Sequence, residues 1–281
     1  MKVAGIVVCN PDYGRLKENV KAIYPQVEMV VVYLNSDFDR GQMEGFDRVH
    51  YLNNGENKGI ATALNSIMEY AESLGAEWCL LLDQDTVVPD DCIELYEKHI
   101  SLEKAAVLSP HIRDDRDMEK IDFSTADFSI IDMCITSGSY NNIAIWNKVK
   151  RYREEFFIDY VDWEYCARVR SSGYKIYRIN TIIVNHQLGA KTYHKFLGKN
   201  VFTYNHNAFR KYYITRNTIV AYKLFPGEPK LAHPYLRTWK RMLFTVLFEE
   251  GKSKKIEAII RGYIDSCKLY RELRRKQKYG Y

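Results

Sequence analysis

Short apolar runs alternate with stretches of helical periodicity over the first 108 residues. The runs are rich in β-branched residues and end in polar or turn-forming residues, which is typical of buried strands. Between them, apolar residues recur every three or four positions, and Gly75 supplies a stop signal after one such stretch. The pattern predicts strands at residues 3–8, 29–34, 49–52, 78–82 and 105–108, and helices at residues 16–23, 60–74 and 93–100.

Strands that alternate with helices predict an α/β fold with an open, mostly parallel sheet flanked by helices. Ligands of such sheets bind at the carboxyl ends of the strands. Polar residues follow three of the predicted strands, namely Asn10, Asn35-Ser36 and Asp83-Gln84-Asp85, so we expect them to converge on one edge. Residues 109–133 are polar and predict a flap or short antiparallel strands, and residues 182–184 are again rich in β-formers.

The pattern changes to a basic helix from residue 234 onward. An apolar stripe there lies beside cationic residues: Trp239, Met242, Leu243, Val246, Leu247 and Phe248 beside Arg237, Lys240 and Arg241. Residues 191–281 hold 21 Lys and Arg against 6 Asp and Glu, a net charge of +15. The first 190 residues hold 20 against 30, a net charge of −10. This asymmetry indicates two surfaces that face different partners, or simply a solvated basic helix.

Composition excludes several classes of protein. A hydrophobic fraction of 46% over 281 residues excludes a disordered chain, and 15 Gly with 7 Pro exclude collagen-like repeats. The 6 cysteines form no C-x-x-C pair, which favours buried thiols in a reducing compartment. The first apolar run is too short for a signal peptide, and no run reaches the roughly 18–20 residues that span a bilayer. We therefore expect a cytoplasmic protein.

Asp83 and Asp85 flank Gln84 at the end of a predicted strand. Alternate strand residues share a face, so the two carboxylates would point the same way. Carboxylates in this arrangement suit Mg²⁺ or Mn²⁺ shared with a diphosphate, because these ions take few protein ligands and keep several waters. An ordinary acidic loop after a strand is the alternative.

Two loops offer polar groups near predicted strand or helix ends. Residues 57–61 precede a helix: Asn57 can cap it, Gly59 allows close backbone approach, and Lys58 favours an anion at the helix N-terminus. Thr136-Ser137-Gly138 follows the apolar run 130–135, where hydroxyls at a strand end can hold a sugar. A plain turn explains either loop equally well.

Three carboxylates, Asp159, Asp162 and Glu164, lie in an aromatic segment. Desolvation by such neighbours raises the pKa of a carboxyl group, which suits a general base. Alternatively, Asp162 is a helix N-cap and Glu164 forms an i,i+4 ion pair with Arg168. His186 follows the β-rich residues 182–184 and is a candidate ligand or a structural histidine.

These segments in this order resemble inverting glycosyltransferases of family 2, which have the GT-A fold, and more narrowly bacterial rhamnosyltransferases of surface-polysaccharide assembly, the class that builds capsule, O-antigen and cell-wall glycans. The resemblance is carried by residues 57–65, 81–85, 157–164, 186–189 and 212–217. It implies a GT-A domain at residues 1–220, with a nucleotide-sugar half at 1–108 and an acceptor half at 109–220. Residues 221–281 would form a basic helical extension.

The resemblance also implies roles for individual residues. Asp85, with Asp83 and His186, would hold Mg²⁺ or Mn²⁺. Asp162 falls on the second position of the family's Glu-Asp motif and would be the general base, with Glu164 and Asp159 as second choices. The nucleotide sugar would contact Asn10, Asn35, Ser36, Lys58, Gly59, Asn65, Asp83 and Gln84. The acceptor would contact Thr136, Ser137, Gly138, Trp163 and Arg216.

The implied reaction is transfer of L-rhamnose from dTDP-β-L-rhamnose to a glycan or lipid-linked acceptor. Family members usually carry Asp-Asn at the end of the second strand, where this chain has Leu34-Asn35, so a UDP-sugar donor stays open. The basic tail would lie on the anionic inner leaflet of the membrane, making the protein peripheral on its cytoplasmic face. The same apolar stripe equally fits a homo-oligomer interface.

Three other classes of function can be compared with the sequence. A non-catalytic carbohydrate-binding protein fits the same residues without a reaction. A nucleic-acid-binding protein fits the basic tail, but the acidic first 190 residues would repel phosphates, so we expect no nucleic acid partner. A sugar-nucleotide pyrophosphorylase needs a Gly-rich loop after the first strand, and residues 10–14 do not supply one.

Overall fold

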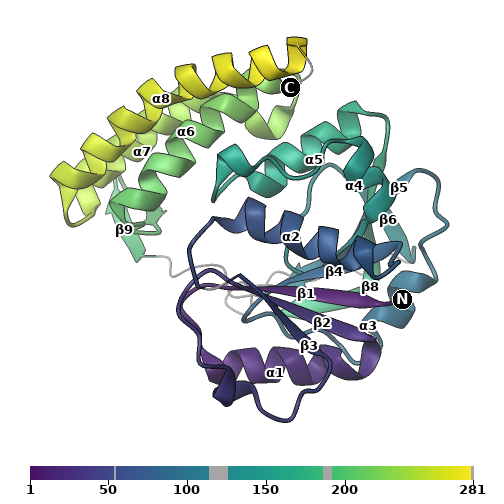
Figure 1. Ribbon diagram of the computed structural model, residues 1–281. Helices are drawn as coiled ribbons and strands as arrows, with labels where there is room; N and C mark the ends of the chain where they lie inside the picture. The colour runs from purple at the N-terminus through teal and green to yellow at the C-terminus, as the bar shows by residue number, and fades with distance from the viewer. Residues whose placement is uncertain (54, 114–125, 186–191, 280–281) are drawn as a thin grey trace. The chain divides into compact units, whose positions relative to one another are not determined.

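The computed structural model describes residues 1–53, 55–113, 126–185 and 192–279 (Figure 1). Packing divides the chain into two compact units. The sheet unit comprises Met1–Glu154 and Val161–Gln187, and the helical unit comprises Glu155–Tyr160 and Leu188–Tyr281. The domain boundaries expected at residues 108 and 220 stay a prediction.

The sheet unit is built on one twisted sheet. Among the described residues it has eight strands in the order β3-β2-β1-β4-β7-β5-β8-β6. β1 pairs in parallel with both β2 and β4, so the carboxyl ends of these strands meet at one edge. The strands are β1 (Val3–Val8), β2 (Met29–Leu34), β3 (Val49–Leu52), β4 (Trp78–Asp83), β5 (Ala105–Arg113), β6 (Phe128–Ile131), β7 (Ser139–Asn142) and β8 (Lys175–Asn185).

Helices cover both faces of this sheet, which is why its central strands are apolar throughout. Residues of α1 and α3 pack on the face formed by Ala4, Ile6 and Val8. α2 packs on the opposite face, where a Cβ on Gly5 would lie 2.1 Å from Ile67. The helices of this unit are α1 (Tyr13–Ile23), α2 (Ile60–Ser73), α3 (Cys92–Glu97), α4 (Ile143–Lys148) and α5 (Val161–Ser171).

The predicted elements of the first 108 residues are confirmed with small shifts of their ends. β4 continues one residue further, to Asp83, and β5 continues to Arg113. β6 pairs antiparallel with β8, as expected for part of residues 109–133. The strand expected up to residue 135 is wrong, because β6 ends at Ile131, just before the exposed Asp132.

The helical unit consists of three helices and a hairpin among its described residues: α6 (Ala208–Leu224), α7 (Pro234–Phe248), α8 (Lys252–Tyr279), β9 (Thr192–Phe196) and β10 (Lys199–Thr203). α6 and α8 pack closely, since a Cβ on Gly262 would lie 2.5 Å from the Tyr212 carbonyl oxygen. The predicted basic helix is confirmed, whereas the hairpin was not predicted. No helix in the described part of the chain is long and apolar enough to cross a bilayer.

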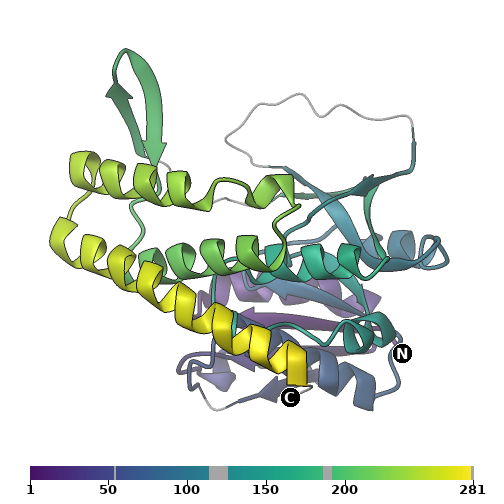
Figure 2. The same ribbon diagram turned by 90° about the horizontal axis from the view of Figure 1, so that it is seen from above.

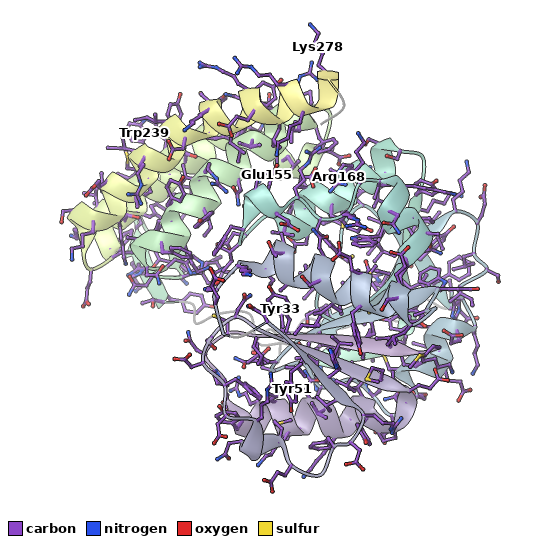
Figure 3. All side chains as sticks on the ribbon, in the orientation of Figure 1. Tyr33, Tyr51, Glu155, Arg168, Trp239 and Lys278 are labelled. Carbon is purple, nitrogen blue, oxygen red and sulfur yellow. The ribbon has the colours of Figure 1, made fainter. Side chains whose placement is uncertain are left out.

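A buried carboxylate anchors α5 within the sheet unit. Glu164 is fully buried and accepts from Arg153 Nε at 2.5 Å and from Arg168 Nη2 at 2.8 Å. Arg168, labelled in Figure 3, also donates to the Val149 carbonyl oxygen. Burial alone would raise the pKa of Glu164, but the two guanidinium groups hold that pKa below its usual value. The predicted i,i+4 pair with Arg168 is thus confirmed, and it belongs to a larger buried cluster.

We expect Glu164→Gln to lower the free energy of unfolding by about 3–5 kcal/mol, because it leaves the buried Arg168 guanidinium and the partly buried Arg153 guanidinium uncompensated. Urea unfolding at neutral pH measures this. A carboxyl whose folded pKa is lowered stabilises the fold above its unfolded pKa and loses that effect as pH falls through the folded value. The difference in the free energy of unfolding between wild type and variant should therefore become smaller at acidic pH.

Glu94→Gln is the matched control, because Glu94 forms an exposed i,i+4 pair with Lys98 at 2.9 Å. Exposed pairs of this kind contribute little to stability. Equal shifts of the urea midpoint in the two variants would contradict a stabilising role for the buried cluster.

Candidate active site

The end of β4 carries the two carboxylates expected to bind a metal. The backbone of Asp83 is fixed on both sides: its N–H donates to Ser137 Oγ at 2.8 Å, and its carbonyl accepts from Asn19 Nδ2 at 2.7 Å. Asp85 Oδ2 lies 3.7 Å from Arg15 Nη1, and both side chains are partly exposed. The carboxylates therefore emerge from a rigid strand end at the surface of the sheet unit.

Hydrogen bonds join the ends of β1, β2 and β4. Gln84 Nε2 donates to the carbonyl oxygens of Cys9 and Asn10, each at 3.3 Å. The Asn10 N–H donates to Ser36 Oγ at 2.9 Å, with Asn10 in the left-handed region that asparagine tolerates. The expected convergence of these polar residues on one edge of the sheet is confirmed.

Asn35 ties the same edge to the start of α2. Its Oδ1 accepts from the Lys58 N–H at 3.0 Å, and its Nδ2 donates to the Gly59 carbonyl at 3.2 Å. Gly59 has φ +84° directly before α2. Asn57 accepts from the Gly59 N–H instead of capping the helix, so the cap expected at Asn57 is wrong. The Lys58 amine is half-exposed, 3.4 Å from Glu56, and remains accessible to an anion.

The loop of Thr136, Ser137 and Gly138 lies beside the end of β4 and leads into β7. The Gly138 N–H donates to the Leu81 carbonyl at 2.8 Å, and the buried Ser137 Oγ lies 2.6 Å from Thr86 Oγ1. The expectation that this loop ends a strand is corrected, since it precedes one. Its hydroxyls and glycine do approach the carboxylate edge, where an acceptor contact stays a prediction.

Asp162 lies in the first turn of α5, one residue inside the helix. One carboxylate oxygen accepts from the Trp163 N–H at 2.9 Å, and the N-cap alternative is wrong because α5 begins at Val161. Asp162 lines a cavity of about 10 Å³ together with Thr136 and Tyr165. Among the described residues the buried Tyr165 Oη has no hydrogen-bond partner. The candidate base and the candidate acceptor loop thus share one cavity.

The two second-choice carboxylates have other tasks. Glu164 is buried between two guanidinium groups, as described above, and no longer qualifies as a base. Asp159, in the helical unit, accepts from Arg210 through both oxygens and is 12% exposed. Both oxygens of this carboxylate are therefore already occupied by a protein partner. Both expectations are corrected on this ground, and Asp162 remains the candidate.

Arg216, an expected acceptor contact, forms its hydrogen bonds within the helical unit. It donates to the carbonyl oxygens of Glu155 and Phe156, and its guanidinium lies 4.7 Å from the Tyr213 ring centroid. Asn217 beside it donates to the carbonyl oxygens of Phe156, Ile158 and Asp159. These bonds shape the segment that leads into α5. Trp163 is partly buried on α5, and its acceptor contact stays a prediction.

Asn65 also has a structural task, which corrects its expected contact with the nucleotide. Its Nδ2 donates to the Tyr152 carbonyl and to Glu154 Oε1, both at 2.9 Å. Its Oδ1 accepts from the Tyr152 N–H at 2.9 Å and from Trp146 Nε1 at 3.3 Å. All hydrogen-bonding positions of this buried amide are occupied by the protein. His186, the expected third metal ligand, lies outside the described residues.

The donor set at the edge suits a divalent cation of the Mg²⁺ class. The described residues contain no group of three His, Cys, Asp or Glu side chains that could enclose a metal. Mg²⁺ is usually bound through one or two carboxylates plus substrate phosphates and waters, and Asp83 and Asp85 can supply those two. Arg15 was missed by sequence reasoning, although its position in the first turn after β1 puts it at this edge.

Comparisons with known proteins agree with this geometry. The chain is 29% identical over 235 residues to the dTDP-rhamnosyl transferase RfbF of Shigella flexneri, covering 77% of this chain and 78% of that protein. Its fold is similar to that of TarS from S. aureus, with a TM-score of 0.58 at 13% identity, covering 100% of this chain and 92% of that one. The mannosyltransferase PcManGT from Pyrobaculum calidifontis, solved with GDP-Man and Mn²⁺, gives a TM-score of 0.58 at 11% identity over 95% of this chain and 74% of that one.

These structural neighbours establish the GT-A type of fold that the sequence predicted, a mostly parallel sheet flanked by helices. The family model of glycosyl transferase family 2 matches residues 5–178, which include the whole carboxylate edge and Asp162. The chain belongs to glycosyl transferase family 2 and is a glycosyltransferase.

Proposed function

We propose that this protein transfers L-rhamnose from dTDP-β-L-rhamnose to a hydroxyl group of a glycan or lipid-linked acceptor, with inversion at the anomeric carbon. The observation that carries the proposal is the carboxylate edge, where Asp83 and Asp85 lie beside the linked ends of β1 and β2. The 29% identity to a dTDP-rhamnosyl transferase supports the choice of donor.

The nucleotide sugar would bind along this edge. Asn35, Ser36 and Asn10 would line the base and ribose, and the exposed Lys58 amine beside the start of α2 would attract the diphosphate. Asp83 and Asp85 would hold Mg²⁺ or Mn²⁺. Such an ion, when bound, offsets negative charge on the departing diphosphate.

Asp162 would act as the general base. Its carboxylate takes the proton of the acceptor hydroxyl, whose oxygen forms a bond to the anomeric carbon. The bond from that carbon to the diphosphate oxygen breaks, and the diphosphate leaves with the electron pair. Attack from the opposite face in a single displacement converts a β-linked donor into an α-linked product. Its place beside Thr136 in the lining of one small cavity supports this role, because Thr136 is a proposed acceptor contact.

The product would belong to a surface polysaccharide assembled on the cytoplasmic face of the membrane. The resemblance to rhamnosyltransferases of surface-polysaccharide assembly supports an acceptor carried on a lipid. Thr136, Gly138 and Trp163 are the proposed acceptor contacts in the sheet unit.

Replacing Asp162 by Asn should reduce the transfer rate by about 10²–10⁴-fold, since the amide cannot accept the proton. The variant should keep the wild-type urea midpoint. Transfer is measured as release of thymidine diphosphate from dTDP-rhamnose in the presence of acceptor. Asp132→Asn is the control, because Asp132 is an exposed carboxylate paired with Arg170 at 3.1 Å. A rate for Asp162→Asn within a few fold of wild type would remove Asp162 from the role.

Thymidine diphosphate with Mn²⁺ should stabilise the protein by about 2.7 kcal/mol at a hundred times its dissociation constant. Thermal unfolding with each nucleotide, with and without the ion, measures this. The metal-dependent part should disappear in Asp85→Ala and persist in the control Asp90→Ala, whose side chain is exposed in the following loop. A stronger shift with uridine diphosphate would replace the donor but keep the family. No shift with any nucleotide would contradict the proposed donor site.

A further inference from the structure

The helical unit contains a pocket of about 400 Å³, formed by β10 and the residues after it together with α6 and α7. We call it the C-terminal pocket. Its described lining includes four cationic side chains and a single carboxylate: Lys211, Arg237, Lys240, Arg241 and Glu249. No residue of the carboxylate edge in the sheet unit belongs to it, so it is separate from the candidate active site.

The one carboxylate is already shared between two lysines. Glu249 is buried and accepts from Lys211 Nζ at 2.6 Å and from Lys255 Nζ at 3.1 Å. Both lysines are buried as well, so this cluster carries an excess positive charge away from water. Burial lowers the pKa of the Lys211 amine even though Glu249 accepts from it. The Glu249 carboxylate is therefore already paired with two lysines, and the other cations of the pocket form no ion pair with it.

Three cations, Arg237, Lys240 and Arg241, lack a carboxylate within ion-pair distance in the described part of the chain. Arg237 donates to the Lys230 carbonyl at 2.8 Å, and Arg241 reaches Thr215 Oγ1 at 3.3 Å. Lys240 lies 5.3 Å from the Phe244 ring centroid. Burial lowers the pKa of the Arg241 guanidinium, although the nearby charges of Asp159 and Glu249 act in the opposite direction. An anion entering the pocket would add a direct ion-pair partner for these three cations.

Large apolar side chains of the same unit are exposed outside the pocket lining. On α7, Leu236 is 69% exposed and Trp239, labelled in Figure 3, is 66% exposed. The hairpin of β9 and β10 projects from the helices (Figure 2) and carries Leu197 at its tip, 86% exposed. A helix with Lys and Arg on one face and large apolar side chains on another is typical of surfaces that lie in a membrane interface. A ligand with a phosphate next to hydrocarbon complements both features.

We propose that the C-terminal pocket binds the phosphate of an anionic phospholipid headgroup, while Trp239, Leu236 and Leu197 enter the interfacial layer of the membrane. The proposal gives the expected peripheral membrane location a specific site. It does not depend on the donor, the metal or the base proposed above. Free phosphate and a second copy of this chain are the other occupants that the same surface chemistry could take, and the experiment separates them.

The test is co-sedimentation of the full-length protein with vesicles of phosphatidylcholine, with and without phosphatidylglycerol. The variant R237Q/K240Q removes two exposed pocket cations, and K252Q/K254Q removes two exposed cations at the start of α8 as a matched control. We expect wild type and control to bind the phosphatidylglycerol vesicles. R237Q/K240Q should bind about thirtyfold more weakly, the effect of two charges at about 1 kcal/mol each. W239A should weaken binding to the same vesicles.

Four results would overturn the proposal. An equal loss of vesicle affinity in both double variants would mean that binding depends only on general electrostatics. Equal binding to neutral and anionic vesicles would exclude recognition of the anionic headgroup. Stabilisation by inorganic phosphate that R237Q/K240Q abolishes, without vesicle binding, would assign the pocket to a soluble phosphate. Self-association that W239A abolishes, again without vesicle binding, would assign the surface to a second copy. Thymidine diphosphate binding by R237Q/K240Q, measured in parallel, keeps this outcome separate from that of the proposed donor site.

Discussion

The buried carboxylate of Glu164 is the interaction on which the geometry of the sheet unit most depends. It fixes α5 through Arg168 on the same helix and through Arg153 on the segment before it. Asp162 lies only two residues away in the first turn, so the anchor also fixes where the candidate base points. A buried ion cluster contributes little net stability compared with an apolar core, but its hydrogen-bond geometry restricts the helix to one position. Glu164, which the sequence offered as a second-choice base, thus helps to position Asp162, the candidate base.

A second constraint is the parallel pairing of β1 with β2 and β4. Parallel neighbours bring their carboxyl ends to one edge, and the links from Asn10 to Ser36 and from Gln84 to Cys9 then hold those ends together. Gly5 belongs to the same argument, because a side chain there would push α2 away from the sheet. The start of α2 brings Lys58 to the edge, so packing in the middle of the sheet determines the charge available to a ligand at its end.

Much of this was predictable from local sequence. The strands β1 and β2 are short and apolar, β4 is apolar up to its last residue, Asp83, and all three are bounded by turn residues, so their pattern fits no other element of that length. The tasks of Asn65 and Asp159 were not predictable, because their partners lie 51 or more positions away in the chain. The identity of a polar residue does not reveal whether its side chain will contact a ligand or another part of the protein. The hairpin of β9 and β10 was missed because its lysines and exposed residues hide the alternation that marks a half-buried strand.

The two units contain similar buried ion clusters in surroundings of opposite charge. Each buries one glutamate between two cations: Arg153 and Arg168 in the sheet unit, Lys211 and Lys255 in the helical unit. The cluster of the sheet unit lies within the first 190 residues, which carry a net charge of −10. In the helical unit the neighbours are Arg237, Lys240 and Arg241, within a segment whose net charge is +15. An acidic unit can concentrate a cation at Asp83 and Asp85, whereas a basic unit can concentrate an anion at its pocket cations. A chain that divides opposite charges between two units can therefore attract a cation at one unit and an anion at the other.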